Sequence, residues 1–228
     1  MLLEEALWFE TQIRKMNPLS IYPMCNVGSS TLEFRTSIQP WIDKHLFQQA
    51  RARGLQVDHL DMKLAPGVDI VGDVTDPGFL EAMKSRSYRS AVCSNVLEHL
   101  TDRRPLCRAL MEMVVPGGYL FVSCPYRYPY HPDPIDSLFR PSARQLAQCF
   151  PGMEVCTADH IAAGTYLQGF AGRPLEGVRA LARLCLPFYK PKTWRLKAQY
   201  IPWMFRSFEA ACVVLRRPEA LQAEGAGS

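Results

Sequence analysis

The feature that most constrains the fold is a series of short apolar segments that each lead to a glycine or an acid. The first ends at Gly28, the second, Gln56 to Leu60, is followed by Asp61, and the third, Val68 to Val71, leads to Asp73. Buried strands of this kind are typical of parallel sheets, and the ligands of open α/β folds bind where the strands' carboxyl ends meet. The series therefore predicts an α/β protein with a doubly wound, mostly parallel sheet and a ligand site at that edge.

Two of these segment ends have chemistry that suits a nucleotide. Gly28 has no Cβ, so the backbone at this turn can approach a ligand closely. The carboxylate of Asp61 can accept hydrogen bonds from both hydroxyls of a ribose. The pair indicates a nucleotide-type cofactor.

Two further motifs follow the acidic strand ends. Ser94 to His99 reads Ser-Asn-Val-Leu-Glu-His, and Val115-Pro-Gly-Gly118 precedes an apolar segment from Tyr119 to Ser123. The glycine-loop strand, the acidic strand ends and these two motifs follow one another in an order that resembles the class I S-adenosylmethionine-dependent methyltransferase family. The resemblance covers roughly Pro23 to Val155. The resemblance implies S-adenosylmethionine as the cofactor and a single Rossmann-like domain. Its sheet would have seven strands, of which the last, Phe208 to Leu215, is antiparallel.

The resemblance also implies which residues contact the cofactor. The glycine loop would lie beside its methionine part, the second strand's end would hold the ribose, the third's would frame the adenine, and the fourth's would face the sulfonium. The implied cofactor-binding residues are Asn26, Gly28, Ser29, Ser30, Asp61, Met62, Asp73, Val74, Asn95 and Val96.

The loop after the first strand departs from the family in two ways. The family usually has an acid before the loop and two or three glycines in it, whereas this chain has Asn26 and Gly28-Ser29-Ser30. We interpret this loop as a variant, because an amide can still donate to the cofactor's carboxylate and serine is small. The second departure is an insertion, Thr31 to Gln39, which we expect to be a loop that forms a lid. The missing glycines also argue against an NAD-binding fingerprint.

A proline-rich segment, Pro125 to Arg140, follows the fifth strand and contains the candidate acceptor site. His131 has an ordinary pKa of about 6.5, which suits a general base, and Asp136 could orient it. The alternative is a histidine that only hydrogen-bonds to the structure. Tyr130 and Arg140 suit a sugar ring or a phosphate, and the segment resembles a loop of methyltransferases associated with bacterial polysaccharide and glycan assembly.

No metal site is predicted, because His45, His59 and His160 have no partners at ligand spacing. For His99, which follows Glu98, we expect a structural role or a place in the wall of the cofactor site. The 8 cysteines are scattered without a Cys-x-x-Cys pair, so we expect reduced and mostly buried thiols.

The basic residues concentrate between Arg173 and Lys197, although the formal net charge of +4 is too small to indicate nucleic acid. The first half of this segment reads as a basic amphipathic helix, which could contact an anionic membrane or, alternatively, pack its apolar stripe on the sheet. We expect a helical basic insert at about 160–205 within one domain of residues 1–217, and a flexible tail over 218–228. With no export signal and no apolar run of about 20 residues, we expect a cytoplasmic protein whose membrane contact is peripheral.

Helical periodicity and turn signals predict the remaining elements. These are helices over Leu2–Met16, Pro40–Arg53, Pro77–Lys84, Thr101–Val114 with Thr101 as N-cap, and Pro141–Phe150, and a strand over Met153–Cys156.

These patterns favour an enzyme that transfers a methyl group to an oxygen, on a sugar or a glycan-linked intermediate. The alternative is a noncatalytic Rossmann-like subunit that binds a partner or membrane glycan machinery, which the glycine-poor loop and the basic helix would also fit.

Overall fold

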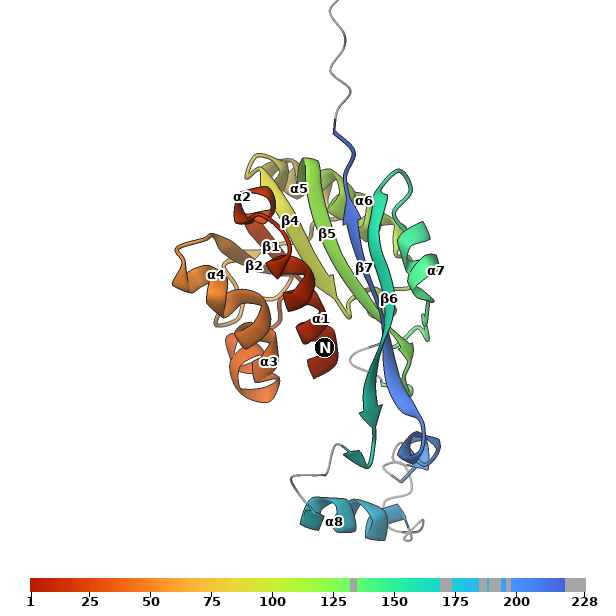
Figure 1. Cartoon of the computed structure of the whole chain (residues 1–228). Coiled ribbons are helices and arrows are strands. Elements are labelled where there is room, and N and C mark those ends of the chain that lie inside the picture. Colours follow the sequence, from red (N-terminus) through yellow and green to blue (C-terminus); the bar gives the residue numbers. More distant parts are fainter. Residues whose placement is uncertain (132–134, 169–173, 185–187, 189–193, 196–197, 220–228) are drawn as a thin grey trace, which may run out of the picture.

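Seven strands form one sheet in the computed structural model, which describes residues 1–131, 135–168, 174–184, 188, 194–195 and 198–219. The strands are β1 Met24–Val27, β2 Val57–Asp61, β3 Ile70–Val71, β4 Tyr88–Ser94, β5 Val114–Arg127, β6 Glu154–Thr165 and β7 Ser207–Arg216. Their order is β3-β2-β1-β4-β5-β7-β6 (Figure 1). The first five are parallel, and β7 is antiparallel to both of its neighbours. This confirms the predicted α/β fold with an antiparallel last strand.

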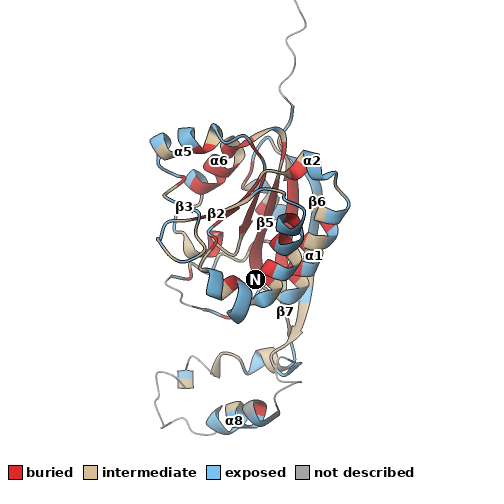
Figure 2. Ribbon diagram, turned by 90° about the vertical axis from the view of Figure 1, so that its left-hand side faces the viewer, coloured by how far each residue is buried: buried red, intermediate tan, exposed pale blue. Residues whose placement is uncertain are grey.

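Helices cover both faces of the sheet, and its central strands are buried between them (Figure 2). One face carries α1 Leu3–Arg14, α2 Pro18–Ile21, α3 Pro40–Ile42 and α4 Gln48–Ala52. The other carries α5 Pro77–Lys84, α6 Arg104–Met113 and α7 Ala143–Gln148. Because successive side chains of a strand point to opposite faces, Phe121 of β5 packs in the first layer and Val122 in the second.

Two helices begin where local capping chemistry places them. The Asp76 side chain accepts from the N–H of Phe79 at 2.8 Å, and Pro77 occupies the first turn, so α5 has the predicted bounds. Ser142 caps α7. The prediction that Thr101 is an N-cap is wrong: α6 begins at Arg104, where the Asp102 carboxylate accepts from the backbone N–H.

Two segment predictions differ from the structure. The insertion at Thr31–Gln39 is not an open loop, because it contains a π-helix, η1 Phe34–Ile38, that leads through α3 and a second π-helix, η2 Asp43–Phe47, into α4. The sixth strand is also longer than Met153–Cys156, since β7 pairs with β6 as far as Thr165. Residues 160–165 therefore belong to the sheet and not to a helical insert.

Beyond the end of β5, the strands β6 and β7 continue as a two-stranded ribbon toward α8 Pro174–Leu184 (Figure 1). The alternative, in which this helix packs an apolar stripe on the sheet, is wrong for the described part, because Leu175, Val178 and Leu181 are exposed. Of the basic segment, Arg173, Lys190, Lys192 and Lys197 lie outside the described residues, as does most of the tail, 220–228. None of the described helices is long and apolar enough to cross a membrane.

Candidate functional site

The carboxyl ends of β1, β2, β4 and β5 meet at one edge of the sheet. Val27 is in register with Leu60 on one side and with Cys93 on the other. The predicted strand-end residues therefore come together, because parallel pairing aligns the points at which the chain leaves each strand.

The loop after β1 has the backbone conformation that the sequence predicts. Gly28 has φ +71°, and a Cβ there would lie 2.6 Å from the Val96 side chain, so no larger residue fits without a shift. The N–H groups of Gly28 and Ser29 both donate to the Leu60 carbonyl at 2.9 Å. Ser30 also has a positive φ, of 55°.

A buried arginine from the inserted segment holds this loop. Arg35 is 1% exposed, and its Nη1 donates to the carbonyls of Ser29 at 2.9 Å and Ser30 at 2.8 Å. Its Nη2 donates to the Gly67 carbonyl at 2.7 Å. The segment predicted to be a lid thus supplies a clamp under the glycine-poor loop. The sequence signal for it was a lone arginine in an insertion, which is too weak to interpret.

The acid after β2 lies against the same loop. The Oδ2 atom of Asp61 accepts from the N–H of Ser30 at 2.8 Å, and Oδ1 accepts from the N–H of Lys63 at 3.1 Å. A carboxylate oxygen accepts more than one hydrogen bond, so both remain available to a ligand. The neighbouring Met62 is 68% exposed.

Three other residues that the family resemblance implies as cofactor-binding, Asp73, Val74 and Asn26, differ in their exposure to solvent. Asp73 follows β3, and its Oδ1 accepts from the N–H of Thr75 at 2.8 Å, while Val74 is buried. Asn26 is buried too, and its Nδ2 donates to Nδ1 of His59 at 3.1 Å. Burial lowers the pKa of His59 to about 4, so the imidazole is a neutral acceptor. The amide of Asn26 is thus bonded within the sheet.

Asn95 follows β4 and contacts a buried acid that the sequence analysis missed. Glu5 of α1 is 1% exposed, and its carboxylate accepts from Nδ2 of Asn95 at 3.1 Å and from the Ser94 hydroxyl at 2.8 Å. The hydroxyl of Ser123, which pairs with Ser94 on the neighbouring strand β5, donates to the same oxygen. Helix α1 therefore closes the edge of the sheet at β4 and β5. Its amphipathic sequence indicated a helix but not this contact.

The two predicted catalytic residues are neighbours. Nδ1 of His131 lies 3.2 Å from Oδ2 of Asp136, which also accepts from the backbone N–H of His131 at 2.9 Å. Although burial acts to raise it, hydrogen bonds from Arg140 and the backbone lower the pKa of Asp136 to about 2. Burial lowers the pKa of His131, so the imidazole is neutral at pH 7. Nη2 of Arg140 donates to Asp136 at 2.6 Å, and Tyr130 is exposed.

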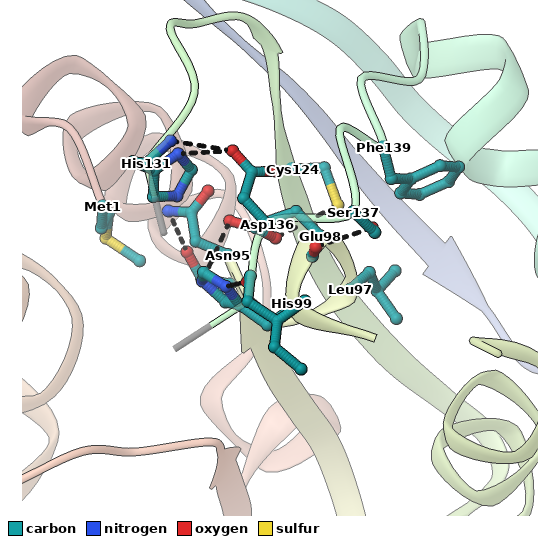
Figure 3. A network of polar contacts seen from close by, with 12 residues as sticks. Met1, Asn95, Leu97, Glu98, His99, Cys124, His131, Asp136, Ser137 and Phe139 are labelled. Atoms are coloured by element: carbon teal, nitrogen blue, oxygen red, sulfur yellow. Dashed lines mark hydrogen bonds and ion pairs between the residues drawn. The ribbon is translucent and has the colours of Figure 1, made fainter. Parts of the chain in front are cut away.

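Glu98 and His99 lie beside His131 (Figure 3). They form the single turn η3 Leu97–His99 after β4, and the rings of His99 and His131 meet edge to face at 5.4 Å. Glu98 is fully buried, and burial raises its pKa to about 7. The sequence analysis did not bring these three residues together, because they come from two loops 32 positions apart.

Two cavities lie away from this edge. One, of about 410 Å³, is lined by Lys84, Glu112 and Arg217, and the other, of about 450 Å³, by residues that include Glu10 and His45. Neither is lined by a residue of the glycine loop.

No protein-family model and no curated protein sequence matches the chain. Solved structures are similar to it. A candidate sarcosine dimethylglycine methyltransferase from Galdieria sulphuraria matches with a TM-score of 0.58 and 11% identity, covering 95% of this chain and 85% of that one. The chain has a Rossmann-like methyltransferase fold.

Two other structures with this methyltransferase fold are similar. Coclaurine N-methyltransferase, bound to N-methylheliamine and SAH, gives a TM-score of 0.51 and 15% identity over 91% of this chain and 70% of that one. The cyclase SpnF gives 0.50 and 17% over 86% and 74%. At these identities the likeness concerns the fold.

Proposed function

We propose that the protein is an S-adenosylmethionine-dependent methyltransferase that methylates an oxygen of a small acceptor, a sugar or a glycan-linked intermediate. The observation that carries this proposal is the meeting of Gly28, Asp61 and Asn95 at the carboxyl edge of a methyltransferase fold. The cofactor proposal is supported by a neighbour of this fold that was solved with SAH.

The cofactor would lie across the ends of β1, β2 and β4. Asp61 would accept from the ribose hydroxyls, with the orientation that Ser30 and Lys63 impose on its carboxylate. The residues after β3, Asp73 and Val74, would frame the adenine. Residues 28–30 would lie beside the methionine part, and Asn95 and Val96 would face the sulfonium.

Methyl transfer requires the acceptor oxygen to approach the methyl carbon in line with the carbon–sulfur bond. A lone pair of the oxygen forms the new bond, the carbon–sulfur bond breaks with its electron pair moving to sulfur, and the hydroxyl proton must leave. His131 would take that proton on Nε2, because Asp136 holds its Nδ1 at 3.2 Å. Asp136 would act as the positioning residue of this pair.

The surroundings of His131 combine aromatic rings with polar groups, which supports a sugar as the acceptor. Near the same loop, the ring of Phe208 contacts two other aromatic rings. The centroid distance is 5.1 Å to Tyr128 and 5.4 Å to Trp203. Aromatic faces of this kind pack against sugar rings, and Arg140 and Tyr130 add polar groups. The polysaccharide association and a cytoplasmic location with peripheral membrane contact through residues 173–197 belong to the same proposal.

A noncatalytic role is the second candidate. The same fold occurs in the cyclase SpnF, so the fold alone does not determine the reaction. In addition, the glycine-poor loop is held in its shape by hydrogen bonds from Arg35. Calorimetric titration with S-adenosylhomocysteine separates the two. We expect one binding site per chain, and the absence of binding by the folded protein would sink the methyltransferase proposal. A mass-spectrometric screen of glycan acceptors with labelled cofactor would then identify the methylated oxygen.

A further inference from the structure

Glu98, His99 and His131 bring one oxygen and two nitrogen ligands into one small space (Figure 3). One potential ligand atom from each lies within 4.8 Å of the other two, and Oε1 of Glu98 is 3.8 Å from Nε2 of His99. Metal–ligand bonds of about 2.1 Å place ligands about 3.0 to 4.2 Å apart, depending on the angle between them. For all three atoms to bind one ion, the distance between the two ligand atoms that lie farthest apart must shorten. The change is at most between a few tenths of an ångström and about 2 Å, depending on the angle between the two bonds.

In each of the two rings Nδ1 contacts oxygen atoms, which leaves Nε2 to a ligand. Nδ1 of His99 lies 2.5 Å from the Ile135 carbonyl, which can only accept, so Nδ1 carries the proton and Nε2 the lone pair. Nδ1 of His131 lies between Oδ2 of Asp136 and the Pro129 carbonyl, at 3.2 and 3.4 Å, and is held in the same way. Partners of this kind orient the histidines of metal sites and set their tautomers.

One oxygen of the Glu98 carboxylate lacks a hydrogen-bond partner among the described residues. Glu98 is fully buried, and its Oε1 has no hydrogen-bond partner among the described residues, whereas Oε2 lies 3.9 Å from the Cys124 thiol. A buried carboxylate oxygen without a partner is unfavourable, and here it faces a nitrogen lone pair. A cation between them would satisfy both atoms. We propose that Glu98, His99 and His131 bind a divalent transition-metal ion.

The donor set indicates the class of metal. Imidazole nitrogens suit Zn²⁺, Fe²⁺, Co²⁺ and Ni²⁺, whereas Mg²⁺ and Ca²⁺ prefer oxygen ligands. Three protein ligands leave at least one coordination position open, as in catalytic zinc sites. Asn95 lies beside the cluster (Figure 3), so the ion would be close to the proposed methyl-transfer site.

The role of this ion rests on the proposed function. An acceptor hydroxyl bound at the open position would lose its proton to solvent more readily, because a bound cation lowers the pKa of an oxygen ligand. The oxygen would then attack the methyl carbon, and the products would be the methyl ether, S-adenosylhomocysteine and a proton. In the metal-free protein the lone pair on Nε2 of His131 is available for the role of base, whereas in the metal-bound protein this nitrogen is a ligand and solvent takes the proton.

The test uses the full chain after treatment with EDTA and dialysis. Isothermal titration with ZnCl₂ is compared for wild type, His99→Ala, Glu98→Gln and the control His160→Ala, which removes an exposed histidine of β6. We expect one zinc ion per chain in wild type and in the control, and binding weaker by about 10- to 100-fold or more in the two cluster variants. Excess MgCl₂ should not compete. Absorption of the Co²⁺ complex in the visible range should change in the cluster variants alone.

Two outcomes would overturn the metal site: no zinc binding by wild type, or equal binding by all four proteins, which would mean adventitious ions on the surface. Each protein is also titrated with S-adenosylhomocysteine, and its far-ultraviolet circular dichroism is recorded. If zinc binds as expected but S-adenosylhomocysteine does not, the proposed function fails and the metal site stands. His99→Ala keeps the test decisive if Glu98→Gln does not fold, because His99 is only half-buried.

Discussion

Asp61→Asn removes the charge of the proposed ribose ligand and nearly preserves its shape. The carboxylate now accepts at both oxygens, from Ser30 at 2.8 Å and from Lys63 at 3.1 Å, and has lone pairs left for two ribose hydroxyls. Asparagine has one acceptor oxygen, so its NH₂ group would face a donor. Losing one hydrogen bond to a charged group costs about 1.5 to 3 kcal/mol, which corresponds to about 10- to 100-fold weaker binding of S-adenosylhomocysteine. Asp61→Ala should weaken binding at least as much.

The assay is calorimetric titration, with Asp58→Asn as the matched control. Asp58 lies in the same strand, but its Oδ2 accepts from the Tyr88 hydroxyl at 2.5 Å, at the opposite end of β2 from Asp61. We expect the control to bind with wild-type affinity, and thermal unfolding should show that both variants are folded. Equal affinity of Asp61→Asn and wild type, or equal weakening by the two variants, would refute the assignment of Asp61 to the cofactor site.

Three further predictions concern the loop clamp, the proposed base and a buried histidine. Arg35→Met should lower the free energy of unfolding, measured in urea, by about 2 to 4 kcal/mol, because it leaves three carbonyls without their donor. A change below about 0.5 kcal/mol would mean that the Arg35 clamp does not stabilise the fold. With an acceptor from the screen, His131→Ala should lower turnover by about 10² to 10⁴ while S-adenosylhomocysteine affinity stays unchanged, and near-normal turnover would contradict its role. The pKa of His59 is about 4 in the folded protein, below its ordinary value, so the unfolded chain binds the extra proton first as the pH falls. Stability should therefore drop by about 3 kcal/mol between about pH 6.5 and 4, and the drop should be absent in His59→Gln. A parallel slope in that variant would assign the loss to other groups.

The membrane proposal is tested on α8. Sedimentation with anionic liposomes should show weak binding that salt abolishes, because each basic residue near such a surface contributes about 1 kcal/mol and is screened. Absence of binding at low ionic strength would leave the helix without a membrane role.

Much of the fold was predictable because its signals are local. Asp76 and Pro77 mark the start of α5, and the apolar segments before Asp61 and Asp73 mark β2 and β3. The signals failed where a neighbour in space decides the conformation. The insertion after Thr31 is helical, with Arg35 buried under carbonyls of the loop before it, and β6 runs on to Thr165 because β7 offers it a partner.

The sequence by itself determined the order of strands and helices and the residue types that stand at the strand ends. Because parallel strands all have their carboxyl ends at the same edge of a sheet, Gly28, Asp61 and Asn95 could be placed together from the sequence alone. Only the tertiary structure decided which acids are buried and what they face. Glu5 reaches Ser94 and Asn95 from a helix about 90 positions away, and Glu98 and His99 meet His131 across two loops. Contacts of this kind depend on how the layers pack, and no spacing within a single segment records them.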